Sequence, residues 1–358
     1  MAIRLTQALH RSVQQKPQGT ATAFLNRRHT FTQFSERVAR LASALRQLGL
    51  QDFDRVGMLA LNSDRYLEYY LACFWARLTV NPCNVRWSAA EVAYSLDDCD
   101  TRVLIVDDAF KVMGANLKTQ STALQTLIYA GEEATPDGML NYEEIIAAAH
   151  AMEDHCGSDD DLAGIFYTGG TTGFPKGVML THGSIHASAM AVAADVIPDG
   201  AIYLHAAPMF HAADFAMSMA QSIRSGTHVF VPAFAPAGVL EVIQAERVSH
   251  TIWVPTMVQM VADFPDIRNY DVSSLHTIVY GASPMNERVI DRAMEAFPGT
   301  GFIQAYGMTE LSPVATILPP YYHTAEGRKT GKMRSAGRTA LCSRLRIVDA
   351  EGADVATG

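Results

Sequence analysis

The first third of the chain alternates helix-patterned and strand-patterned segments. Apolar residues recur at helical spacing from Thr32 to Leu48, and Arg55–Ala60 is typical of a buried strand. A second helix is predicted over Asp64–Arg77. The segment Ser88–Leu96 predicts a capped helix that leads into the strand Val103–Val106. Strands separated by helices in this way indicate βαβ units and parallel pairing.

The same alternation continues through the rest of the chain. It predicts an α/β class of fold, with layered α/β subdomains in which mainly parallel sheets are flanked by helices. The segment Arg344–Val348 predicts a strand that enters a turn, as the start of a small β subdomain at the C-terminal end. The further strands are expected at Gly164–Tyr167, Val178–Thr181, Ile202–His205, His228–Val231, Thr251–Val254, Thr277–Tyr280 and Gly301–Gln304.

A polar, acidic link at Gly157–Asp161 marks a candidate boundary near residue 160. We therefore expect an N-terminal α/β subdomain at residues 1–160 and a second α/β subdomain at residues 161–330. Residues 331–358 are expected to begin the β subdomain. Because no terminal cap is evident at Gly358, the sequence indicates a truncated chain.

Composition excludes several classes of protein. With 358 residues, 49% hydrophobic and 18% charged, the chain is long and apolar enough to bury a large core. A net charge of -9 argues against a nucleic-acid partner, which usually requires a basic face. The five cysteines form no CxxC pair, which favours a reducing compartment and argues against a zinc cluster. Without a signal peptide or a membrane-spanning run, a cytoplasmic protein is expected.

The most informative stretch is a loop rich in glycine and threonine, Tyr167–Gly177. A phosphate chain requires close backbone N–H groups, hydroxyl donors and a cation, and the loop supplies all three, the cation from Lys176. A flexible linker is the alternative, but linkers rarely place a Pro-Lys pair directly before an apolar strand. The Walker pattern fails because Lys176 lies between Pro175 and Gly177. A dinucleotide fingerprint fails because a predicted strand, and no helix, follows the loop.

A second block, Gln304–Glu310, follows a predicted strand and combines an aromatic ring, a hydroxyl and a carboxylate. We expect Tyr306 to stack on a base, Thr309 to donate to an α-phosphate oxygen and Glu310 to hold a divalent ion. The small residues of Gly281–Pro284 would let a flat ring lie against the backbone. Ordinary turns at strand ends are the alternative for both segments.

These motifs carry a family resemblance. The string YTGGTTGFPKGVMLTH, Tyr167–His182, resembles the signature loop of the adenylate-forming superfamily, which contains acyl-CoA synthetases, luciferases and peptide-synthetase adenylation domains. The block Gln304–Glu310 is similar to the YGxTE motif of this family, and Gly281–Pro284 is similar to its adenine-binding segment. The resemblance covers nearly the whole chain.

The resemblance implies a site for ATP and Mg²⁺ within residues 161–330. Catalytic roles fall to Lys176, His211, Thr309 and Glu310. Thr171 and Glu310 would position the magnesium ion. The residues expected to bind ATP are Thr168, Gly169, Gly170, Thr171, Thr172, Gly173, Lys176, Gly281, Ala282, Ser283, Gln304, Tyr306, Gly307 and Thr309.

The acyl side of the site is implied by Pro208–His211, which resembles the acyl-side motif of the family. Relatives that activate amino acids carry Asp where this chain has His211, so an acid without an α-amino group is favoured. Phe215 falls where some relatives carry an aromatic gate. Trp253, Val254 and Thr256 are expected in the wall of the acyl pocket. Ordinary core packing is the alternative for His211 and for the wall.

The implied activity is that of an acyl-CoA synthetase, an AMP-forming acid–thiol ligase. It would activate a fatty or aryl carboxylic acid with ATP and pass the acyl group to coenzyme A. Full-length relatives continue into a TGD motif, a hinge and a small C-terminal domain with a catalytic Lys, so weak or absent activity is expected for a chain ending at Gly358. Transfer to a carrier protein and a non-catalytic nucleotide-binding fragment are the alternatives. Peripheral membrane contact and a homodimer are left open.

Overall fold

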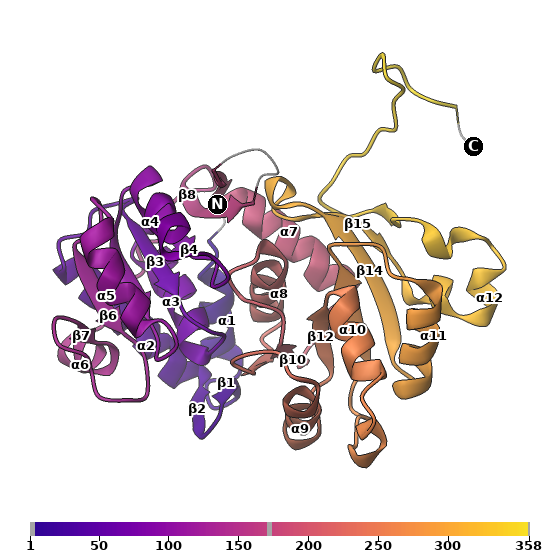
Figure 1. Ribbon diagram of the computed structural model, residues 1–358, viewed down its shortest axis with the longest axis horizontal. Helices are drawn as coiled ribbons and strands as arrows, with labels where there is room; N and C mark the ends of the chain where they lie inside the picture. Colours follow the sequence, from indigo (N-terminus) through magenta and orange to yellow (C-terminus); the bar gives the residue numbers. More distant parts are fainter. Residues whose placement is uncertain (1–3, 170–173, 357–358) are drawn as a thin grey trace.

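The computed structural model describes residues 4–169 and 174–356. It contains two β-sheets flanked by helices, one built mainly from the first half of the chain and one mainly from the second (Figure 1). Most neighbouring strands pair in parallel within each sheet. The predicted α/β class with mainly parallel sheets is therefore confirmed.

The first sheet has the strand order β7-β6-β5-β3-β4-β8-β9, and its β8–β9 pair is antiparallel. Its strands are β3 (Arg55–Leu59), β4 (Thr79–Pro82), β5 (Thr101–Val106), β6 (Thr126–Tyr129), β7 (Leu140–Asn141), β8 (Leu162–Thr168) and β9 (Lys176–Thr181). The helices of this part are α2 (Phe31–Gln47), α3 (Asp64–Trp75), α4 (Ala89–Asp98), α5 (Lys111–Gln120) and α6 (Tyr142–Ala148).

The second sheet has the order β16-β15-β14-β13-β12-β10-β11-β1-β2. Its strands are β1 (Thr20–Phe24), β2 (Arg27–Thr30), β10 (Ile202–His205), β11 (Thr227–Phe230), β12 (His250–Trp253), β13 (Thr277–Gly281), β14 (Gly301–Gly307), β15 (Val314–Leu318) and β16 (Arg338–Thr339). The α-helices are α1 (Gln7–Gln15), α7 (His182–Asp195), α8 (Ala212–Ile223), α9 (Pro236–Glu246), α10 (Pro255–Ala262), α11 (Glu287–Ala296) and α12 (Ala325–Arg328). The 3₁₀ turns are η1 (Ile267–Asn269), η2 (Thr309–Leu311), η3 (Pro320–His323) and η4 (Lys332–Arg334).

The two sheets exchange segments along the chain. Strands β1 and β2 join the second sheet, whereas β8 and β9 join the first sheet through β4. The predicted boundaries of the subdomains at 1–160, 161–330 and 331–358 describe units that fold independently. The order of strands in a sheet does not test independent folding, so these boundaries stay predictions.

The predicted strand at Arg344–Val348 is wrong. Val348 forms a single bridge with Asp354, and the residues before it are irregular. Leu345 and Ile347 are exposed. An apolar run forms a strand only where a neighbouring strand offers backbone partners, and within residues 174–356 none pairs with this segment.

Helix α3 joins the two sheets. All of its residues are buried, and it lies against β3 and β4 of the first sheet and β1 and β11 of the second. On this helix, the Tyr70 hydroxyl donates to the carbonyl of Met209 at 2.7 Å, and the Tyr70 ring lies 4.8 Å from the Phe215 ring of α8. Its buried carboxylates are paired, since the Arg27 Nη2 atom lies 2.7 Å from Asp64 Oδ1 and the Arg37 Nε atom lies 2.7 Å from Glu68 Oε1. Pairing is what makes buried charges tolerable.

Buried histidines make the stability of this fold depend on pH, and two of them show the effect clearly. Burial lowers the pKa of His182, at the start of α7, from 6.5 to about 4, and burial likewise lowers the pKa of His250 to about 4. Between pH 4 and 6.5 the unfolded chain therefore binds protons that the folded chain does not. The free energy of unfolding rises with pH across this window and is lost as pH falls through it.

We expect urea unfolding at pH 5 to show lower stability than at pH 7, with each buried histidine contributing up to about 1.4 kcal/mol per pH unit. The variant His182→Gln should flatten this dependence, because its amide does not titrate. His150→Gln, at an exposed position, is the control for loss of an imidazole. If the free energy of unfolding of His182→Gln depended on pH as steeply as that of the wild type, His182 would not be a source of the pH dependence.

Candidate active site

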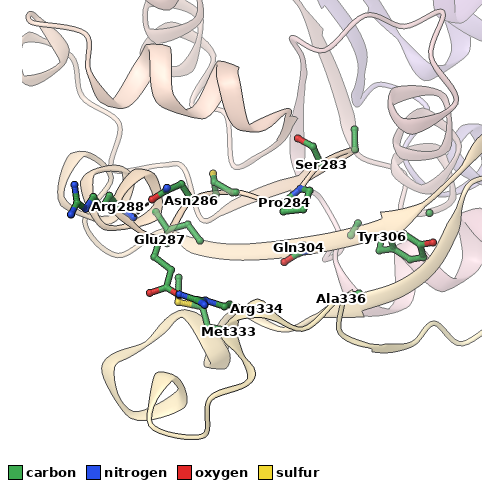
Figure 2. Close-up of a pocket in the computed structure, with 15 residues that line it drawn as sticks. Ser283, Pro284, Asn286, Glu287, Arg288, Gln304, Tyr306, Met333, Arg334 and Ala336 are labelled. Atoms are coloured by element: carbon green, nitrogen blue, oxygen red, sulfur yellow. Dashed lines mark hydrogen bonds and ion pairs between the residues drawn. The ribbon is translucent and has the colours of Figure 1, made fainter. Parts of the chain in front are cut away.

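Two cavities open at the carboxyl ends of the central strands of the second sheet. The larger cavity measures 690 Å³ and lies between β13, β14, the start of α11 and η4 (Figure 2). The smaller cavity measures 410 Å³ and lies among β12, β13, β14, α7 and α8. Parallel α/β sheets commonly bind ligands at this edge. Four residues line both cavities: Ala282, Ala305, Tyr306 and Gly307.

The cavities lie on opposite faces of the sheet, as strand register shows. Side chains alternate between the two faces of a strand, and residues paired in parallel register share a face. Ile252 is paired with Val279, and both line the smaller cavity. Tyr280 is paired with Gln304, which lines the larger cavity on the other face. The cavities can therefore meet only where the strands end.

Close backbone approach shapes this meeting point. A Cβ atom added to Gly307 would lie 1.8 Å from the Pro313 carbonyl oxygen, and one added to Gly281 would lie 2.4 Å from the Ala305 carbonyl oxygen. Both positions therefore require glycine. Ala282, which directly follows Gly281, adopts a left-handed backbone conformation with φ of +66°. Such strain in a residue other than glycine is common at binding sites.

The larger cavity offers a flat ring and an ion pair. Tyr306 is 51% exposed, and none of the described residues bonds its hydroxyl, so its ring is free to stack. The Gln304 Oε1 atom accepts a hydrogen bond from the Tyr280 hydroxyl at 3.3 Å. In Figure 2, Glu287 and Arg334 point toward each other, and the Arg334 Nε atom donates to Glu287 Oε1 at 2.6 Å. Ser283 and Pro284 add small groups to the wall.

The flank of the glycine-rich loop lies beside the Thr309–Glu310 segment. Strand β9, which begins at Lys176, lies against η2, which begins at Thr309. Lys176 is exposed, and its backbone oxygen accepts from the Thr168 hydroxyl at 3.5 Å. The exposed Gly169 precedes the rest of the loop. The predicted loop residues Gly170, Thr171, Thr172 and Gly173 lie outside the described residues.

The residues present suit a magnesium ion held together with phosphate. Glu310 is exposed, and its carboxylate has no partner among residues 4–169 and 174–356. The neighbouring Thr309 lines the smaller cavity. No group of three or more His, Cys, Asp or Glu side chains that suits a metal is found in the described parts of the chain. One carboxylate fits magnesium, which keeps several waters and takes its other ligands from substrate phosphates.

The smaller cavity is mainly apolar, and the polar side chains in its lining include Arg86, His211, Asp214 and Thr309. Its walls include Val192, Met217 and Val279. Burial beside the cavity, together with the positive charge of Arg86, lowers the pKa of His211 from 6.5 to about 4. His211 is therefore a neutral imidazole at pH 7.

A buried polar chain fixes helix α8, and with it His211, against the sheet. The Asp214 carboxylate accepts from the Tyr203 hydroxyl at 3.0 Å and lies 2.7 Å from His205 Nδ1. The Nε2 atom of His205 lies 2.9 Å from His228 Nδ1. All four side chains are buried. Because His211 immediately precedes α8, this anchoring sets the position of its imidazole.

Three of the residues predicted on the acyl side differ in position from His211 and Val254, which line the smaller cavity. Phe215 is 1% exposed, lines neither cavity and packs against aromatic rings of the core. Thr256 is exposed and also lines neither cavity. Trp253 borders the smaller cavity, but it pairs with Tyr280 and its ring packs on Phe297, which places the ring on the opposite face. His211 and Val254 line the smaller cavity as expected.

Sequence patterns did not reveal Arg86 or the Glu287–Arg334 pair. Arg86 lies two residues before the N-cap Ser88 of α4, where the sequence suggests an ordinary turn residue. Its proximity to the smaller cavity depends on how the two sheets face each other. The roles assigned to individual site residues stay predictions.

Comparison with known proteins now decides the family. The model of the family described as "AMP-binding enzyme" matches residues 9–358. The chain belongs to this family. A feruloyl-CoA synthase from Amycolatopsis sp is 33% identical over 97% of the chain and 67% of its own length. A long-chain-fatty-acid–CoA ligase from Thermus thermophilus is 29% identical over 92% of the chain and 61% of its own length.

Solved structures agree with this membership. The N-terminal domain of FACL13 from Mycobacterium tuberculosis matches with a TM-score of 0.87 and 25% identity, over 98% of this chain and 86% of that one. An anthranilate CoA ligase, AuaEII, in complex with anthranoyl-AMP has the same fold, with a TM-score of 0.91 and 22% identity over 100% of this chain and 68% of that one. This AMP-binding enzyme thus spans about two thirds of the length of the curated relatives it matches.

The exposed ring of Tyr306 generates a prediction for AMP. Base stacking on an aromatic side chain contributes about 1–3 kcal/mol, so Tyr306→Ala should weaken AMP binding by roughly 5- to 150-fold in a calorimetric titration. Tyr306→Phe keeps the ring and should bind like the wild type, since no described residue bonds the hydroxyl. Equal affinity of the Ala variant and the wild type would place the base elsewhere.

Proposed function

We infer that this AMP-binding enzyme activates a fatty or aryl carboxylic acid as its acyl adenylate, as the large part of an AMP-forming acid–CoA ligase. The observation that carries this function is the junction of the two cavities at Ala282, Ala305, Tyr306 and Gly307. A cavity with an exposed ring suits a nucleotide base, and a mainly apolar cavity suits an acyl group. Their junction is where a carboxylate and an α-phosphate would meet.

The chemistry follows from this arrangement. A carboxylate oxygen attacks the α-phosphorus, the new C–O–P linkage forms, and pyrophosphate leaves with the electron pair of the broken P–O bond. Neither oxidation nor net proton transfer is needed, so catalysis consists mainly of positioning and neutralising charge. Tyr306 holds the base, Thr309 donates to an α-phosphate oxygen, and Lys176 neutralises the leaving phosphates. The neutral His211 borders the acyl group without adding charge.

Glu310 would hold a magnesium ion, which neutralises phosphate charge when it is bound. The carboxylate of Glu310 is exposed next to Thr309 and is therefore accessible to such an ion. Thr171 would be the second contributor, as the family resemblance implies.

The acyl acceptor is coenzyme A in this proposal. The thiol attacks the acyl carbon, AMP leaves, and the thiol proton passes to solvent. A carrier protein is the second candidate, because a fatty acid–[acyl-carrier-protein] ligase from Streptomyces coeruleorubidus is 30% identical over 99% of the chain. Thioester assays with the two acceptors separate these candidates. None of the described helices is both long and apolar enough to span a bilayer.

Acid-dependent exchange of pyrophosphate into ATP tests the adenylation step. We expect weak, acid-dependent exchange with Mg²⁺ present when the chain is given octanoate, palmitate, benzoate or cinnamate, with one class of acid preferred. Nucleotide binding without exchange for any acid would contradict adenylation and favour a non-catalytic nucleotide-binding protein.

Thr309 offers an isosteric test within the same assay. Thr309→Val removes the hydroxyl and keeps the shape of the side chain, so exchange should fall by about 10²–10³-fold. Thr309→Ser keeps the hydroxyl and should retain most of the activity. A Val variant that exchanges as fast as the Ser variant would remove Thr309 from the α-phosphate.

A further inference from the structure

Arg86 brings a charge from the first sheet to a cavity built on the second. It lies in the loop between β4 and α4, both of which belong to the first sheet's half of the molecule. It nevertheless lines the smaller cavity, together with His211 and Thr309. Arg86 is exposed, so its side chain borders solvent at the edge of this cavity.

The guanidinium of Arg86 has no hydrogen-bonding or ionic partner within the described ranges 4–169 and 174–356. Other arginines of the first sheet are paired: Arg65 contacts Glu143, and Arg77 contacts Asp52 and Asp161. An arginine left unpaired beside a cavity retains all of its donors for a ligand.

Among the described residues that line the smaller cavity, no free negative charge neutralises Arg86. The lining residues include one carboxylate, Asp214, which is buried and already bonded to Tyr203 and His205. His211 also lines the cavity, and its lowered pKa of about 4 leaves it neutral at pH 7. The remaining walls are mostly apolar, so a ligand with an apolar body and one anionic end fits the cavity.

We propose that Arg86 binds the carboxylate of the acid substrate and thereby selects acids over neutral analogues at the smaller cavity. This inference rests on the proposed adenylation. A guanidinium presents two parallel N–H donors that match the two oxygens of a carboxylate. An α-phosphate is the other oxyanion near the junction. The carboxylate is favoured because the other walls of the cavity that Arg86 lines are mostly apolar, which suits the acyl group attached to a carboxylate.

A binding experiment on the whole chain separates these anions without requiring turnover. Dissociation constants are measured in the presence of AMP for octanoate and cinnamate and for their neutral amides, octanamide and cinnamamide, and separately for ATP. The variants are Arg86→Gln, Arg86→Lys and Arg268→Gln, the last at an exposed arginine that lines neither cavity.

We expect Arg86→Gln to weaken binding of the preferred acid by about tenfold or more, because a hydrogen bond to a charged group is lost. Binding of the amide and of ATP should not change. Arg86→Lys should retain part of the affinity for the acid, because lysine keeps the positive charge but lacks the two parallel N–H donors of the guanidinium. Arg268→Gln should match the wild type throughout.

The other outcomes overturn the inference. Weaker ATP binding with unchanged acid binding would assign Arg86 to the phosphate. Equal loss for acid, amide and ATP would show that Arg86 only supports the fold of the cavity. A wild type that binds the amides as well as the acids would also overturn the role of Arg86. Adenylation would still stand in that case if acid-dependent pyrophosphate exchange is observed, so the two proposals fail separately.

Discussion

The alternation of side chains along β14 controls the geometry of the site. Neighbouring residues of one strand face opposite sides of a sheet, so Gln304 lines the larger cavity alone, whereas the next residue, Ala305, also lines the smaller one. Where its strands are hydrogen-bonded to one another, a sheet leaves no opening between its two faces. Two ligands bound on its opposite faces can react only beyond the strand ends. The site therefore lies at the carboxyl ends of β13 and β14, where the backbone of Gly307 and Ala282 forms the border of both cavities.

That border must be thin. At Gly281 and Gly307, a side chain would collide with a carbonyl oxygen of a neighbouring segment, so the strand ends pack backbone against backbone. Thr309 follows directly and lines the smaller cavity. The turn η2 lies against β9, which carries Lys176 at its start. Strand β9 and turn η2, which are far apart in the sequence, thus lie side by side.

Local patterns predicted much of this arrangement. The predicted strand Ile202–His205 matches β10, and the cap at Ser88 precedes α4 as expected, because apolar period and capping chemistry are local signals. The position of side chains on sheet faces is set by register between strands, which a single sequence does not encode locally. Trp253 illustrates this, since its ring lies on the face opposite to Ile252. Arg86 is a second case, because its place depends on packing between the two sheets.

The distance from Arg86 to the smaller cavity is set by the core between the sheets and not by the loop that carries it. Helix α3 lies against strands of both sheets, and Tyr70 on this helix bonds to the backbone of Met209, two residues before His211. The capping box of Ser88 fixes the other end of the short loop. A buried helix with paired charges cannot shift without exposing those charges or leaving them unpaired. The backbone that carries Arg86 and the apolar wall are therefore held at a fixed separation, as selection of an anionic end on an apolar ligand requires.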